Sequence, residues 1–178
     1  GVWAAAGTSV EVIDAASTSG VAVGNYATIK GSTDAVSIGT NASIASGSAN
    51  SVAFGKNASI ATGATGAIAF GNAANVNASA TSAVAIGNSA TAKAAKTVAL
   101  GNAALAAAVD SIAIGDHTTS SGENSIAVGV NASATNNNAI AVGNTANATN
   151  DRTVAIGLSA SATTSDTIAI GSNAKSLN

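Results

Sequence analysis

The sequence contains no cysteine, proline or methionine, and aromatic residues make up only 2% of its 178 residues. An ordinary globular core needs bulky side chains to fill an irregular interior at a density close to that of organic crystals. Hydrophobic residues reach 47% here, but alanine is the commonest of them, and serine, threonine, asparagine and glycine are also abundant. We therefore expect a core that is thin and regular.

Charge is scarce as well, with 6 basic and 8 acidic residues and a net charge of −2. Nucleic-acid binding requires clustered Lys and Arg to neutralise phosphates, whereas the basic residues here are scattered from Lys30 to Lys175. We expect no nucleic-acid partner.

Long apolar runs are absent, since the longest extends only from Ala103 to Val109. A membrane-spanning helix needs about 20 apolar residues. Residues 1–7 contain neither the basic segment nor the Leu-rich stretch of a secretory signal. We expect this segment neither to insert into a membrane nor to carry its own export signal.

Residues suited to catalysis are also few. The single histidine, His117, follows Asp116 in a turn-like sequence, and no cysteine accompanies them. Both side chains could reach a metal, but acid–base catalysis and metal binding need several convergent groups. Solvated turn residues are the better interpretation, so we expect no enzyme activity, catalytic residue, cofactor or metal site.

An internal repeat is the strongest feature of the sequence. A string of small, β-branched, small and bulky residues ends in glycine eleven times, first at spacings of fifteen or sixteen and then, from Gly87 onward, at a constant spacing of fourteen. The glycines are Gly24, Gly39, Gly55, Gly71, Gly87, Gly101, Gly115, Gly129, Gly143, Gly157 and Gly171. Glycine at these positions allows a turn with positive φ or a close approach between backbones.

The bulky–small–bulky pattern before each glycine has a period of two residues, which is typical of a strand with one buried face. A second short strand follows, with small apolar residues alternating with polar ones. So short a unit has room for two strands and two turns, and identical positions in successive units would stack as ladders. We predict an all-β fold, a single-chain parallel β-roll solenoid of about eleven coils of 14–16 residues. Residues 1–19 would form an N-terminal cap or partial coil, and residues 20–178 the repeats.

We assign the two faces of the first strand by bulk. The bulky residues should form the core ladder, with the alanines between them pointing outward. The core ladder then includes Ile112, Ile114, Ile126, Val128, Ile140, Val142, Val154 and Ile156. The outward alanines would form a continuous apolar stripe of a kind that monomers rarely leave exposed. We therefore expect a contact between chains at Ala85, Ala99, Ala113, Ala127, Ala141 and Ala155.

The strings Ser-Val-Ala-Phe-Gly (51–55), Ser-Ile-Ala-Ile-Gly (111–115) and Ser-Ile-Ala-Val-Gly (125–129) resemble the head repeats of YadA-like trimeric autotransporter adhesins of Gram-negative bacteria. The resemblance extends from Val21 to about Lys175 and implies a left-handed roll and a homotrimer. It also implies display on the bacterial cell surface, as the distal part of a fibre anchored in the outer membrane. No neck motif, heptad stalk or membrane-barrel segment is visible, so we interpret the chain as a head fragment.

The resemblance implies an adhesin that binds a host extracellular-matrix or cell-surface protein, or that mediates self-aggregation. Two alternatives remain. An ice-binding solenoid would need a regular array of Thr, whereas the outward column mixes Ser, Thr and Asn with Leu105 and Lys175. A passive structural spacer is the other alternative.

Overall fold

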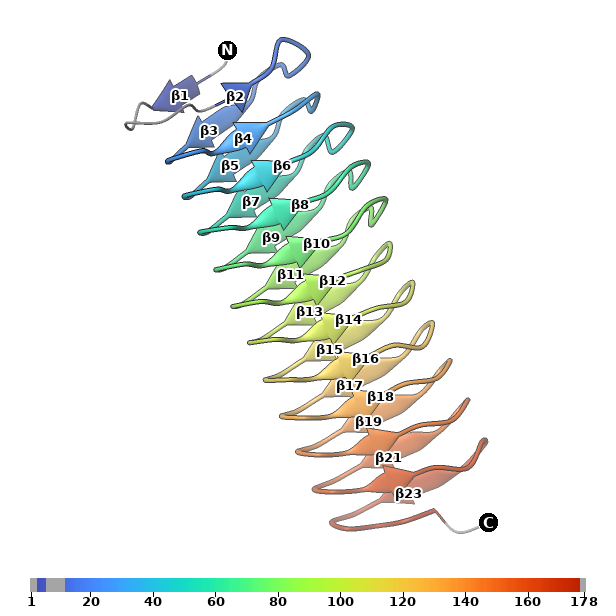
Figure 1. Ribbon diagram of the computed structural model, residues 1–178. Coiled ribbons are helices and arrows are strands. Elements are labelled where there is room, and N and C mark those ends of the chain that lie inside the picture. The colour runs from blue at the N-terminus through green and yellow to red at the C-terminus, as the bar shows by residue number, and fades with distance from the viewer. Residues whose placement is uncertain (1–2, 6–11, 177–178) are drawn as a thin grey trace.

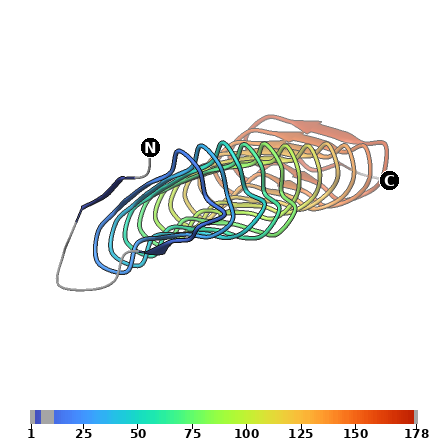
Figure 2. The same cartoon turned by 90° about the horizontal axis from the view of Figure 1, so that it is seen from above.

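The computed structural model describes residues 3–5 and 12–176, and in these ranges all regular structure is β-strand. Short strands alternate along the chain between two parallel sheets, so that each coil contributes one strand to each sheet. The coils stack into a long, slender rod (Figures 1 and 2). The predicted all-β parallel solenoid is therefore confirmed.

The first sheet has 12 strands and the second has 11. The first consists of β1 (Trp3–Ala5), β3 (Val21–Val23), β5 (Val36–Ile38), β7 (Val52–Phe54), β9 (Ile68–Phe70), β11 (Val84–Ile86), β13 (Val98–Leu100), β15 (Ile112–Ile114), β17 (Ile126–Val128), β19 (Ile140–Val142), β21 (Val154–Ile156) and β23 (Ile168–Ile170). The second consists of β2 (Val12–Ile13), β4 (Thr28–Ile29), β6 (Ser43–Ile44), β8 (Ser59–Ile60), β10 (Asn75–Val76), β12 (Thr91–Ala92), β14 (Leu105–Ala106), β16 (Thr119–Ser120), β18 (Ser133–Ala134), β20 (Asn147–Ala148) and β22 (Ser161–Ala162).

Each strand pairs in parallel with the equivalent strand of the next coil, without a shift in register. Ala113 of β15 lies opposite Ala127 of β17, for example, and Ser133 of β18 lies opposite Asn147 of β20. On the N-terminal side of residue 20 the sheets continue in residues 3–5 and 12–13, where β1 pairs with β3 and β2 pairs with β4; the rest of the predicted cap over residues 1–11 lies outside the described residues. Such stacking joins positions that are one repeat apart into continuous ladders.

The glycine that follows each strand of the first sheet adopts a conformation that L-residues rarely take. Gly129 has a φ of 132°, and a Cβ added to it would lie 2.6 Å from the carbonyl carbon of Gly143 in the next coil. Both the backbone conformation and this close approach require glycine. The same two constraints recur from Gly24 to Gly157.

The interior lies between the two sheets and is filled mainly by alanine. From β3 to β23 the middle residue of each strand in the first sheet is fully or almost fully buried, and Ala85, Ala99, Ala113, Ala127, Ala141 and Ala155 are all 0% exposed. The second sheet turns Ala or another small or β-branched residue inward and polar side chains mostly outward, as the sequence predicts.

The burial of these alanines corrects our assignment of the first strand's faces. The predicted core ladder lies on the outer face and is partly exposed; it consists of Ile112, Ile114, Ile126, Val128, Ile140, Val142, Val154 and Ile156. The six alanines predicted to line a contact between chains point into the roll. The reason is steric, because the inward positions of the short coils hold no side chain larger than that of Thr118, which leaves no room for a ladder of isoleucines.

The length of a coil correlates with the size of the side chain that the second residue of its second-sheet strand turns inward. The four longer coils begin at Gly24, Gly39, Gly55 and Gly71, and they bury the largest interior side chains, Ile29, Ile44, Ile60 and Val76. The shorter coils, which begin at the glycines from Gly87 to Gly157, bury only Ala or Ser at this position. The longer loops also turn one further residue inward, such as Ser48 or Ala64. A longer coil encloses a wider interior, and the bulkier side chain fills it.

Exchanging these side chains should destabilise both kinds of coil. We expect Ile60→Ala to lower the free energy of unfolding by about 2–5 kcal/mol, because it leaves a cavity in one of the longer coils. We expect Ala106→Ile to lower it by about 1–3 kcal/mol through overpacking of one of the shorter coils. Denaturant unfolding measures both values. A neutral Ala106→Ile variant would show that coil length is not matched to interior bulk.

Candidate assembly and binding surfaces

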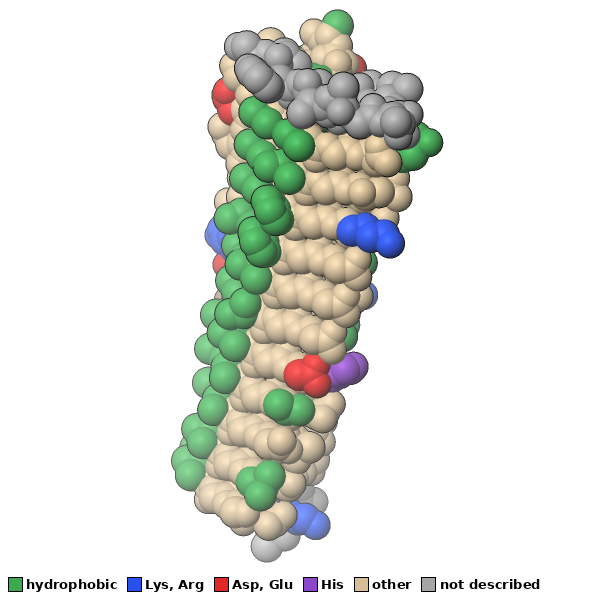
Figure 3. All heavy atoms as spheres, turned by 90° about the vertical axis from the view of Figure 1, so that its left-hand side faces the viewer, with side chains coloured by type: hydrophobic (Ala, Val, Ile, Leu, Met, Phe, Trp, Pro, Cys, Tyr) green, Lys and Arg blue, Asp and Glu red, His purple; other side chains and the backbone are tan. Residues whose placement is uncertain are grey.

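The outer face of the first sheet carries an apolar stripe. We define the stripe as the first and third residues of each strand of this sheet from β3 to β23. All of these residues are Val, Ile, Leu or Phe. Phe54, Leu100 and Ile156 are 41%, 41% and 37% exposed. Figure 3 shows the hydrophobic side chains as a continuous band along the rod. Soluble monomers rarely expose contiguous apolar surfaces larger than a few hundred square ångströms, so this face is suited to association with another chain.

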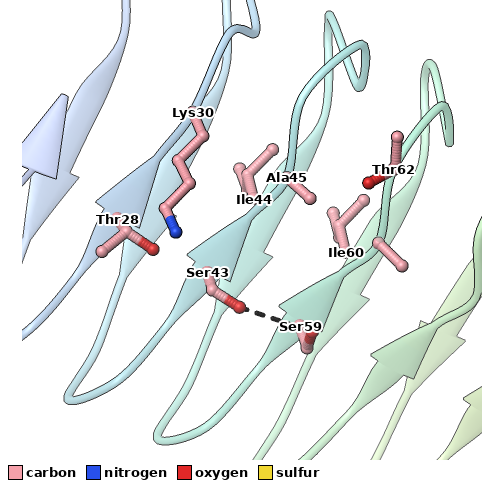
Figure 4. Close-up of a pocket in the computed structure, with 9 residues that line it drawn as sticks. Thr28, Lys30, Ser43, Ile44, Ala45, Ser59, Ile60 and Thr62 are labelled. Atoms are coloured by element: carbon pink, nitrogen blue, oxygen red, sulfur yellow. Dashed lines mark hydrogen bonds between the residues drawn. The ribbon is translucent and has the colours of Figure 1, made fainter. Parts of the chain in front are cut away.

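The outer face of the second sheet is polar. It contains a shallow hollow of about 270 Å³ lined by Thr28, Lys30, Ser43, Ile44, Ala45, Ser59, Ile60, Ala61 and Thr62. In Figure 4 the side chain of Lys30 extends along the sheet, and a weak hydrogen bond of 3.4 Å joins the hydroxyl groups of Ser43 and Ser59. These lining residues offer hydroxyl groups and one cation but no carboxylate, imidazole or thiol group.

A ladder of amide side chains runs along the edge formed by the glycine turns. Asn72 donates a hydrogen bond to Asn88, and Asn88 donates to Asn102, each over 2.8 Å. Asn102 then donates to Oδ1 of Asp116 over 2.7 Å. Each residue directly follows a turn glycine, so the register of the coils brings equivalent side chains together. The ladder ties four successive coils together.

Asp116 and His117, the pair that we considered for metal binding, contact each other at this edge. Nδ1 of His117 lies 3.0 Å from Oδ2 of Asp116, and both side chains are largely solvated. The hydrogen bond from Asn102, followed by the one from His117, lowers the pKa of Asp116 below its usual value. Within the described ranges, no group of three His, Cys, Asp or Glu residues is arranged to hold a metal. Asp116 is the last acceptor of the amide ladder, and His117 contacts it from the next position.

The opposite edge, formed by the longer loops, carries most of the charges. Lys96 lies 3.9 Å from Asp110 in the next coil. Arg152 forms a bidentate pair with Asp166, with Nη2 2.8 Å from Oδ2. The hydrogen bonds of this pair raise the pKa of Arg152 and lower that of Asp166. These exposed pairs connect neighbouring coils and keep this edge hydrophilic.

Comparison with known families identifies the repeat. A sequence model of the YadA head domain repeat matches residues 78–104, 92–118, 120–146 and 148–174, which together make up more than half of the chain. The chain belongs to the YadA head family. The resemblance seen in the sequence is thereby confirmed, and the family is one of adhesins rather than enzymes.

A solved YadA head has the same architecture. The chain is similar to the crystal structure of the collagen-binding domain of the Yersinia adhesin YadA, with a TM-score of 0.61 and 25% sequence identity. The match covers 84% of this chain and 72% of the Yersinia domain. No curated protein sequence matches the chain significantly. The described ranges also contain no helix with the length and hydropathy needed to cross a bilayer.

The carboxylate that ends the amide ladder should make stability depend on pH. The folded-state pKa of Asp116 is lowered, so its contribution is present above the ordinary pKa of 3.8 and is lost as the pH falls through the lower folded-state value. We expect Asp116→Asn, which keeps an acceptor for Asn102, to lower the melting temperature slightly at pH 7. The difference from the wild type should vanish near pH 2. Thermal melting at several pH values measures this difference, and a difference that is independent of pH would contradict the assignment.

Proposed function

We propose that the chain is the head of a bacterial surface fibre and that three copies pack through their apolar stripes. The observation that carries this proposal is the uninterrupted apolar stripe on the first sheet of a chain that belongs to a family of adhesins. Burying the stripe between copies would remove its Val, Ile, Leu and Phe side chains from water. This burial would stabilise the assembly by roughly 25 cal/mol for each Å² of apolar surface buried. Membership of the YadA head family supports three copies and a left-handed coil as part of this proposal.

This proposal moves the contact between chains from the alanines to the bulky columns beside them. Each coil would contribute two apolar side chains to the interface, such as Ile126 and Val128 of β17. The stripe contains no charged or polar side chain from β3 to β23, so no buried charge would need a partner. We propose residues 20–178 as the head repeats and residues 1–19 as an N-terminal cap or partial coil.

We further propose that the polar surfaces of the assembled head bind a host extracellular-matrix or cell-surface protein, or heads on neighbouring cells. The similarity to a collagen-binding domain supports a matrix ligand. The second sheet and the two edges present mainly hydroxyl, amide and charged side chains over many coils, which suits an extended ligand better than a small substrate. Such surfaces gain affinity through many weak contacts, which an assembly of three parallel rods multiplies. The fibre would be anchored in the outer membrane, with this head at its distal end.

Two double variants test assembly and adhesion together. Ile126→Arg with Ile140→Arg would introduce two guanidinium groups into the stripe, and Ser133→Arg with Asn147→Arg would introduce them into the polar face of the second sheet. We expect the first pair to convert trimers into folded monomers and to weaken collagen binding at least tenfold through lost avidity. The control pair should remain trimeric.

Light scattering, circular dichroism and a collagen-binding assay on the same samples measure these outcomes. A stripe variant that keeps the mass of a trimer would place the contact on another surface. Monomers that bind as tightly as the wild type would show that each rod binds alone. If trimers bound neither collagen, fibronectin, laminin nor whole cells, the spacer function would be favoured instead.

A further inference from the structure

The apolar stripe contains one aromatic pair. Phe54 and Phe70 are the only phenylalanines in the sequence, and they are the third residues of the neighbouring strands β7 and β9. Their rings are stacked with centroids 4.8 Å apart and planes within 6° of parallel. The side chains are 41% and 47% exposed. The two rings contact each other within one chain while much of their surface remains uncovered.

We call the two stripe residues of one strand a level. The aliphatic levels on either side of the phenylalanine pair are nearly equivalent to one another. Phe54 follows Ile38 in its column, and Phe70 precedes Ile86. From β11 to β23 every level combines two residues from Val, Ile and Leu. Two such stripes that slip past each other by one coil, about 4.8 Å, would lose contacts only at their ends. Buried aliphatic area therefore discriminates weakly between registers.

The aromatic pair responds differently to a slip. In parallel copies around one axis, equal levels face each other, so the Phe54 and Phe70 levels of all copies meet only when no copy is displaced. A slip of one coil keeps half of this match, and a slip of two coils sets every phenylalanine against Val, Ile or Leu. Aromatic rings favour offset-stacked and edge-to-face contacts with each other beyond the area that they bury. The contacts of the phenylalanine pair therefore depend on the axial register of the copies, whereas the contacts of the aliphatic levels hardly do.

We propose that Phe54 and Phe70 fix the axial register in which copies of this chain associate. The partner is a second copy of the same chain, and the inference rests on the proposed assembly through the apolar stripe. The two phenylalanines act as a specificity element for self-recognition within a surface whose remaining side chains supply mainly hydrophobic area.

The absence of cysteine allows a direct measurement of register. Lys93 is exposed and lies directly after β12 of the second sheet, away from the stripe, so Lys93→Cys can carry a single spin label. In trimers with all copies aligned, pulsed dipolar spectroscopy should give one narrow distance distribution. We expect Phe54→Ile with Phe70→Ile to keep the trimer mass but to add further distances, because displaced copies become populated.

Two further variants keep this test specific. The control Val84→Ile with Ile86→Val redistributes aliphatic bulk in β11, leaves the phenylalanines in place and should give the narrow distribution of the wild type. Adding Ile86→Phe and Leu100→Phe to the Phe54→Ile, Phe70→Ile chain moves the aromatic pair by two coils and should restore a narrow distribution.

The remaining outcomes separate the two proposals. A narrow distribution in the Phe54→Ile, Phe70→Ile trimer would overturn the register assignment and leave the assembly intact. Loss of trimer mass in that variant would also overturn it, because the pair would then be needed for association itself. A wild-type chain with the mass of a monomer would overturn the proposed assembly and the inference with it.

Discussion

The narrow space between the two sheets constrains most of this structure. Each coil has only two short strands joined by tight turns, so the inward side chains of one sheet directly face those of the other. Alanine fills this space along almost the whole rod, and the small hydroxyl residue Ser48 donates a hydrogen bond from the interior to the carbonyl oxygen of Ala61 over 2.8 Å. A single coil cannot hide its apolar groups from water, so stability depends on stacking many nearly identical coils.

The same constraint explains where the bulky residues lie. Larger side chains enter the interior only where a coil is lengthened, as at Ile44 and Ile60. In the first sheet, bulk that does not fit inside is placed on the outer face, where β-branched residues suit a pleated surface. The hydrophobic surface of the chain is thus divided between an alanine interior, which stabilises the roll, and an outer stripe, which is available to other chains.

The edges of the rod are held by a different set of interactions. Amide ladders and coil-to-coil ion pairs replace the covalent crosslinks that a protein without cysteine lacks. Each contact is exposed and individually weak. Because register is exact along the stack, however, every unit places its polar side chains beside those of its neighbours. Repetition therefore yields extended polar surfaces, a property suited to multivalent binding.

The recurring glycines and the alternation of bulky and small residues determined the coil number, the parallel stacking and the family directly from the sequence. The amide ladder could also have been found, because Asn88, Asn102 and Asp116 each follow a turn glycine and recur with the spacing of the repeat. The sequence did not determine which face of the first strand lies inside, since Ile112-Ala113-Ile114 has the same period of two in either orientation. Only the tertiary structure decided this, because the width of the interior depends on both sheets and both turns together, and that width admits Ala113 and excludes the isoleucines.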